Sequence, residues 1–262
     1  MNQAIGAAAG FFRELDVHVR ARYPLLWLVS PEEQRIDGIL DQLARTHGKS
    51  FYSWSVTRGL ARVTAGKLER AQKKSDPMEV LDQIEQLTVP AVIALKDFHP
   101  FLADPQIVRR LRELAGHLKG TYKTVCLVSP TLHLPPELEK EITVLDVPLP
   151  DTTELLQLLQ EIVGVVREGG RVTIDLQREQ AFQLVQAARG LTLAEAENAF
   201  AKAVAVDQRL SASDLQLILD EKKQVIRKSG LLEYFSEQGD LGQVGGYEEL
   251  KRWLGRRQRA FT

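Results

Sequence analysis

The sequence lacks several features that would place it in a specialised class of proteins. It has a single cysteine, Cys126, which excludes an internal disulfide framework and fits a reducing compartment, so the expected location is the cytoplasm. No apolar run approaches the roughly eighteen residues that a membrane span needs. The 34 lysines and arginines nearly balance the 35 aspartates and glutamates, so the net charge gives no general attraction for nucleic acid or anionic membrane. These absences indicate an ordinary globular protein.

Short runs of branched apolar residues alternate with longer helical patterns over the first 150 residues. Such alternation is typical of a parallel sheet covered by helices, and the fold class is therefore predicted as α/β, with a five-stranded parallel sheet and helices on both faces. The strands are expected at Leu25–Val29, Phe51–Val56, Val89–Leu95, Thr124–Val128 and Thr143–Val147. Helices are expected at Glu32–Thr46, Pro77–Leu87 and Pro105–Leu118, and near the start with Phe11, Leu15 and Val19 on one face.

After Pro150 the apolar residues recur at helical spacing, and the sequence shows no convincing strand except a short candidate at Val172–Ile174. Three of the predicted helices begin with a capping signal, in which a side chain that can accept a hydrogen bond stands three residues before an acid. The pairs are Asp151 with Glu154, Thr192 with Glu195, and Ser211 with Asp214. The predicted domains are an α/β domain at 1–150, an all-helical lid at 151–229 and a connector at 230–262. Apolar residues at helical spacing predict the core of the lid, namely Leu155, Leu158, Phe182, Val185 and Phe200.

A phosphate-binding loop is missing from the turn after the first strand, where the sequence reads LWLVSPEEQRI. Such a loop needs glycines that turn backbone N–H groups inward, a lysine for the phosphates and a serine or threonine for magnesium. Pro31 lacks an N–H, and Glu32 and Glu33 are negative. The tripeptide Gly48 to Ser50 imitates the end of a Walker A motif, but it leads into a predicted strand, so a helix stop is the better interpretation.

The acidic pair that holds magnesium and orients water is also incomplete. The third strand ends as LKDFHP, in which Asp97 is the only acid. No arginine lies between Lys123 and Arg167, the region from which a hydrolase of this type supplies an arginine finger. Ser129 follows the fourth strand, where such enzymes place a polar sensor, although Ser-Pro is also a plain turn. Ser30, Asp97 and Ser129 are the candidates for a remnant nucleotide pocket, whereas no catalytic or metal-binding residue is assigned.

The order of these parts resembles the P-loop-NTPase fold of the AAA+ ATPases over about 16–229, with VLDVPLPDTTELLQLL leading into the lid. The segments RARYPLLWLVSPEEQRI, WSVTRGL and LKDFHPFLADPQIVRRLREL look like the amino-terminal half of two-part AAA+ proteins encoded as conserved reading frames in cyanobacteria and red-algal plastids. In that family the first half is degenerate and the second carries the intact ATPase. The segment QVGGYEELKRWL, which includes Gly245 and Gly246, is similar to the segment that precedes the first strand of an active AAA+ module.

The resemblance implies that this chain acts without a cofactor of its own, while its parent protein uses ATP and magnesium. The expected partner is a downstream ATPase module of the same protein, following Thr262; a homo-oligomer and a further protein partner stay open. Arginines on one helix and in the tail are the candidate interface residues, together with one tryptophan: Arg109, Arg110, Arg112, Trp253, Arg256 and Arg257.

Three functions remain open. The favoured one is a non-catalytic module for binding, assembly or regulation in a larger ATP-hydrolysing protein. The first alternative is a weak nucleotide-binding ATPase in its own right. The second is nucleic-acid binding through the arginine clusters, which is less favoured because solvated faces are the ordinary role of such residues.

Overall fold

The computed structural model describes residues 7–64, 66–69, 76–168 and 173–228, together with Glu249, Arg252 and Trp253. Its main sheet has seven strands in the order β4-β3-β2-β5-β6-β1-β7. The strands are β1 (Leu25–Val29), β2 (Ser50–Ser55), β3 (Gly59–Thr64), β4 (Lys67–Leu68), β5 (Ala91–Lys96), β6 (Lys123–Ser129) and β7 (Ile142–Asp146). The five parallel strands predicted from the sequence are all present, each within two residues of its predicted ends.

Two further strands, β3 and β4, extend the sheet in the antiparallel sense and were not predicted. In β3 small, charged and hydroxyl residues are mixed with the apolar ones, so the segment carries little hydrophobic periodicity of its own. It forms a strand because it folds back on β2, with Tyr52 opposite Arg62 and Trp54 opposite Leu60. Cross-strand pairing of this kind depends on a neighbour and is therefore a weak signal in a single segment.

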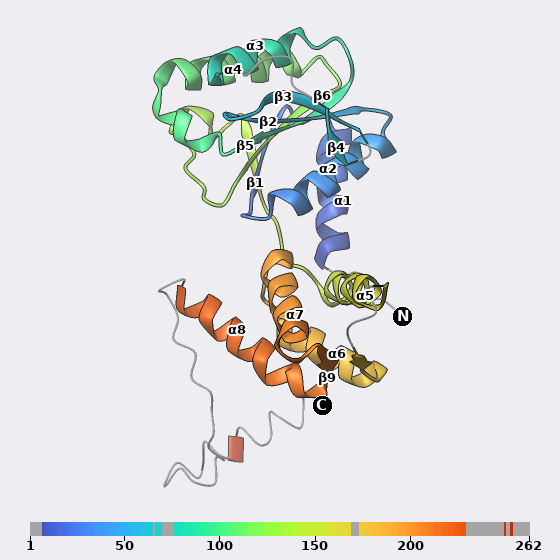
Figure 1. Ribbon diagram of the computed structural model, residues 1–262. Coiled ribbons are helices and arrows are strands. Elements are labelled where there is room, and N and C mark those ends of the chain that lie inside the picture. Colours follow the sequence, from blue (N-terminus) through green and yellow to red (C-terminus); the bar gives the residue numbers. More distant parts are fainter. Residues whose placement is uncertain are drawn as a thin grey trace. The chain divides into compact units, whose positions relative to one another are not determined.

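Helices cover both faces of the sheet, as predicted (Figure 1). One face packs on α3 (Pro77–Gln86) and α4 (Pro105–Leu118), around Trp27, Trp54 and Phe98. The other packs on α1 (Ala7–Arg20) and α2 (Glu33–Thr46). The predicted stripe of Phe11, Leu15 and Val19 is buried against that second face. Burial on both faces explains why the central parallel strands β1, β5 and β6 contain continuous apolar runs.

The helical region follows, with α5 (Thr152–Glu168), α6 (Arg178–Ala188), α7 (Leu193–Asp207) and α8 (Leu215–Lys228). The prediction of an all-helical region needs one correction, because β8 (Thr173–Asp175) and β9 (Arg209–Ser211) form a two-stranded parallel sheet. The short candidate strand at Val172–Ile174 overlaps β8 at Thr173 and Ile174, whereas β9 was not predicted. Each strand has three residues, and a parallel pair joins segments distant in sequence, so the local pattern is weak. Val172 lies outside the described residues.

The predicted core of the helical region is partly wrong. Leu155, Val185 and Phe200 are fully buried, and Leu158 is partly exposed. Phe182 is 49% exposed, and Leu184, two positions further along α6, is buried instead. Phe182 and Leu184 both lie at helical spacing from other apolar residues, so periodicity alone does not say which face of α6 meets α5.

The three predicted capping pairs are present. Asp151 accepts from the backbone N–H of Glu154, whose carboxylate accepts in return from the N–H of Asp151. The pairs of Thr192 with Glu195 and of Ser211 with Asp214 have the same reciprocal form. These bonds satisfy N–H groups that a helix start leaves without a partner inside the helix.

By its contacts the chain forms two compact units, Met1–Leu219 and Asp220–Thr262. In the second unit the structure describes the end of α8 and three residues near the carboxyl terminus, where Arg252 pairs with Glu249 at 3.3 Å. Among the helices described, none is long and apolar enough to cross a bilayer.

Candidate functional site

The turn after β1 is the place where a sheet of this type offers a ligand the ends of its strands and the start of a helix. Ser30 is buried there, and its hydroxyl accepts from the backbone N–H of Glu32 at 3.1 Å. Its own N–H donates to the carbonyl of Ser129 at 2.9 Å. The serine therefore closes the turn locally. Glu32, two positions further on, is the last residue before α2.

The carboxylate of Glu32 is buried and bonded on both oxygens. Oε1 accepts from the backbone N–H of Leu193 at 2.6 Å, and Oε2 accepts from Arg35 Nη1 at 3.0 Å. Leu193 is the first residue of α7, so its N–H belongs to a helix start, where anions are favoured. A carboxylate of the chain itself thus occupies an anion-binding position.

Arg35 completes this network, and its side chain is only 5% exposed. Its guanidinium donates two parallel bonds to Glu154, both 2.9 Å long, and a third to the carbonyl of Pro148 at 2.6 Å. Burial alone would lower the pKa of Arg35, but the bonds and charges of Glu154 and Glu32 outweigh it and raise the pKa. The arginine therefore stays charged and joins α2 to the start of α5.

Ser129 and Asp97, the other two candidates for a remnant pocket, lie at the same edge of the sheet. The Ser129 hydroxyl is buried, accepts from Trp27 Nε1 at 2.9 Å and donates to the carbonyl of Thr131 at 2.8 Å. Asp97 lies in the turn directly after β5 with a φ of 48°, and its side chain is exposed. The structure thus brings Ser30 and Ser129 together by a backbone bond, and gives both hydroxyls structural bonds.

Asp97 lines a polar cavity of about 740 Å³ that includes neither of the two serines. The cavity lies beside α2 and the ends of β2 and β5. Within it Lys96 Nζ donates to Asp37 at 2.5 Å and lies 3.5 Å from Glu33. Burial raises the pKa of Asp37, and Lys96 opposes that shift. Lys96, the last residue of β5, is therefore bound to acids of α2.

The structure also brings together two histidines that sequence spacing does not connect. The ring of His99 stacks on that of His133, with centroids 6.0 Å apart and planes inclined by 22°. His99 Nδ1 is buried without a hydrogen-bond partner and lies 4.0 Å from Asp97 Oδ1. Within the described ranges no group of three or more His, Cys, Asp or Glu residues could hold a metal ion.

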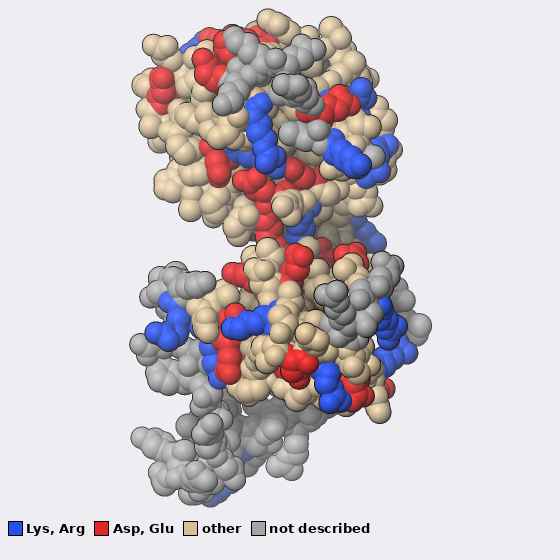
Figure 2. Space-filling view, in the orientation of Figure 1, with Lys and Arg blue, Asp and Glu red and all other residues tan. Residues whose placement is uncertain are grey.

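The arginines of α4 do not form one basic surface. Arg110 pairs with Asp82 and Glu85 of α3, and Arg109 pairs with Glu113. Acidic and basic side chains are interspersed on the face shown in Figure 2. Arg112 is exposed and lines a smaller cavity, as Glu137 does. In the tail Trp253 is half exposed, while Gly245, Gly246, Arg256 and Arg257 lie outside the described residues.

A nucleoside triphosphate with magnesium does not fit the residues at this edge. Its phosphates need free N–H donors and a lysine, and its metal needs a hydroxyl and an acid. Here the N–H of Glu32 is bonded to Ser30, and Lys96 is bonded to acids of α2. The network of Glu32, Arg35, Glu154 and Leu193 joins segments that only folding brings together, so the sequence alone did not predict it.

Solved structures with a similar fold include an AAA domain. The chain superposes on the FIGL-1 AAA domain, in complex with ADP in that structure, with a TM-score of 0.52 at 15% identity, covering 84% of both chains. It superposes on C. elegans PCH-2 with a TM-score of 0.55 at 11% identity, covering 85% of this chain and 69% of that one. At these identities the likeness establishes the fold alone.

Sequence relatives extend the match along nearly the whole chain. The AAA domain-containing protein ycf46 of Trieres chinensis is 32% identical over 255 residues, and its namesake in Guillardia theta is 29% identical over 258 residues. Both alignments cover 96% of this chain but 50% and 49% of the relative, so the chain spans about half the length of the curated relatives it matches. Residues 11–147 match the N-terminal domain of the SpoVK-like AAA ATPases, and residues 153–229 match the second domain of the same family. The chain therefore belongs to the SpoVK-like AAA ATPase family.

Proposed function

We propose that this chain is a non-catalytic AAA+-like module that serves binding, assembly or regulation within a larger ATP-hydrolysing protein. In this proposal residues 1–150 form a degenerate α/β domain, 151–229 a helical lid, and 230–262 a connector toward a following ATPase module. That ATPase module, which would use ATP and magnesium, is the main partner of the chain.

The observation that carries the proposal is the position of the Glu32 carboxylate. It follows β1, precedes α2 and accepts the N–H of Leu193 at the start of α7. A phosphate placed there would meet a buried negative charge, and like charges at close range in a poorly solvated site repel strongly. An intrinsic ATPase would have to displace this carboxylate before it could grip a phosphate.

The same network explains how the module holds its form without a nucleotide. Glu32 joins the turn after β1 to α7, while Arg35 joins α2 to Pro148 and Glu154. Ionised donors and acceptors with two parallel bonds give strong and directional contacts. Side chains of the chain itself therefore link the α/β part to the helical region, as a bound phosphate could otherwise do. This suits a module whose conformation does not depend on a nucleotide.

The test is a titration of the complete chain with a fluorescent ATP analogue and magnesium, together with a phosphate-release assay. We expect no saturation below about 1 mM, which corresponds to roughly 4 kcal/mol of binding free energy or less. Release should stay at the level of a buffer control. Binding in the micromolar range that is lost in Ser30→Ala or Asp97→Asn would overturn the proposal and favour a weak ATPase.

A nucleic-acid function is tested separately. We expect no binding of labelled single-stranded RNA or DNA at physiological salt, since Arg109 and Arg110 already pair with acids. Binding that weakens steeply as salt rises, and that is lost in Arg112→Ala, would support that alternative instead.

A further inference from the structure

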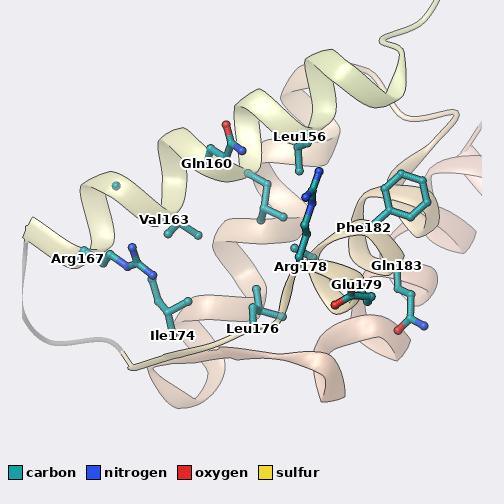
Figure 3. A pocket seen from close by; sticks show the side chains of 13 residues that line it. Leu156, Gln160, Val163, Arg167, Ile174, Leu176, Arg178, Glu179, Phe182 and Gln183 are labelled. Carbon is teal, nitrogen blue, oxygen red and sulfur yellow. The ribbon is translucent and has the colours of Figure 1, made fainter.

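An open groove lies in the helical region between α5 and α6, with the segment of β8 along it (Figure 3). Its volume is about 1100 Å³, and it is separate from the network of Glu32 and Arg35. The residues of α5 that line it follow one helical face and include Leu156, Leu159 and Val163. Ile174 and Leu176 add apolar surface from the segment that follows α5.

Phe182 shows that this apolar surface is incompletely covered. The ring lines the groove from α6 and is 49% exposed. A phenylalanine in a helix that packs on another helix ordinarily faces the core, but on α6 it is Leu184 and Val185 that are buried. Exposed apolar residues that gather in one concave surface are typical of interaction sites, in contrast to single ones scattered over a surface.

Two arginines give the groove a charge. Arg167 lines it from the last turn of α5, and Arg178 from the first turn of α6 (Figure 3). Among the residues described, neither forms an ion pair with a carboxylate, although Glu179 also lines the groove. Guanidinium groups bind carboxylates with two parallel hydrogen bonds, and they gain most beside apolar surface that excludes water. The groove therefore combines apolar contact area with positions for two carboxylates.

The length of the groove indicates the form of its ligand. From Leu156 to Arg167 the lining face of α5 rises through about 16 Å, at about 1.5 Å per residue. This length corresponds to about three turns of a second helix. Helices with apolar residues on one face commonly bind in such grooves through anchors at i, i+3 or i+4, and i+7.

We propose that this groove binds an acidic amphipathic helix of a partner protein, which packs its apolar face on α5 and α6 and places carboxylates at Arg167 and Arg178. The inference goes beyond the proposed function, since it names a binding site and a partner chemistry. It does not depend on whether the chain binds ATP.

The test uses fluorescein-labelled helical peptides of sixteen residues and the complete chain, with binding followed by fluorescence anisotropy. The first peptide carries leucines at i, i+3, i+4 and i+7 and glutamates on the other face. The second replaces every glutamate with lysine, and the third scrambles the order of the first. We expect saturable binding of the first peptide, and at least tenfold weaker binding of the other two. No binding of the first peptide, or equal binding of the scrambled one, would overturn the proposal.

Gly164 offers a variant that fills the groove without disturbing its walls. It lines the groove from α5, and a Cβ at this position would meet no atom within 4 Å. Gly164→Leu should weaken binding of the acidic peptide at least tenfold because its side chain extends into the groove. Gly164→Ala is the matched control, since it gains the same helix propensity but fills little space, and it should bind within about twofold of the original chain.

Arg178→Glu tests the charge. It should weaken binding of the acidic peptide and strengthen binding of the lysine peptide. Lys140→Glu, which reverses an exposed charge outside the groove, should change the binding of neither peptide. Circular dichroism and thermal unfolding establish that each variant is folded. Equal binding by Gly164→Leu and Gly164→Ala, both folded, would place the peptide elsewhere and contradict the proposal.

Discussion

One carboxylate oxygen of Glu32 lies 2.6 Å from the backbone nitrogen of Leu193, 161 positions further along the chain. The first residue sits in the turn after β1 and the second begins α7. This bond uses the N–H of a helix start, a group that commonly binds phosphate or another anion. It therefore joins two parts of the chain and occupies an anion-binding position at the same time.

Arg35→Ala should lower the stability of the chain strongly. The change leaves the carboxylate of Glu32, only 6% exposed, without its cation, and removes both bonds to Glu154. Loss of one partner of a buried ion pair costs about 3 to 5 kcal/mol. Urea unfolding followed by circular dichroism measures the loss. Arg109→Ala, whose ion pair with Glu113 is exposed, is the control and should cost about 0.5 kcal/mol or less. Equal costs for the two variants would contradict the interpretation of the network.

Ser129→Ala should act on stability and leave nucleotide titrations unchanged. Its hydroxyl accepts from the buried Trp27 Nε1, which would lose its partner. A buried donor left without an acceptor costs about 1 to 3 kcal/mol. The red shift and intensity of tryptophan fluorescence during urea unfolding report the change. A stability equal to that of the original chain would show that the bond to Trp27 contributes little.

Leu184→Ala and Phe182→Ala should differ because the two residues, two positions apart, lie on different faces of α6. Leu184 is fully buried, and its truncation should cost about 2 to 5 kcal/mol through lost burial and a cavity. Phe182 is half exposed, so its larger truncation should cost less than that of Leu184. Thermal unfolding of both variants is the measurement. A greater loss for Phe182→Ala would mean that α6 presents its other face to the core.

Cys126 should resist thiol reagents in the native chain. Burial in β6 raises the pKa of its thiol to about 12 from an ordinary 9.0, so almost no thiolate is present at pH 8. Labelling with a chromogenic disulfide reagent should be slow without denaturant and complete in 6 M urea. Because the folded pKa lies above the unfolded one, the contribution of this thiol to stability is full below about pH 9 and is lost as pH rises toward 12. Cys126→Ala should reduce the fall in stability over that range, whereas rapid native labelling would place the thiol at the surface.

The sequence by itself determined the parts whose signals are local. The apolar runs of β1, β5 and β6 predicted strands because strands buried on both faces need continuous apolar residues. The stripe of Phe11, Leu15 and Val19 predicted a helix with a buried face, and Asp151 with Glu154 predicted a helix start. The absence of a phosphate-binding loop, predicted from Pro31 and Glu32, stays a prediction; it too rests on a local signal, because the chemistry of such a loop is set by neighbouring residues.

Tertiary structure alone decided the features that depend on distant partners. The strand β3 exists because it pairs with β2, and the two-stranded sheet of β8 and β9 joins segments more than thirty residues apart. Helical periodicity placed both Phe182 and Val185 in the core, but the packing of α6 buried only the second. No local pattern connects Glu32 with Leu193 or Arg35 with Glu154. Those bonds form because the fold brings these residues together, and burial then makes an unpaired charge too costly to leave.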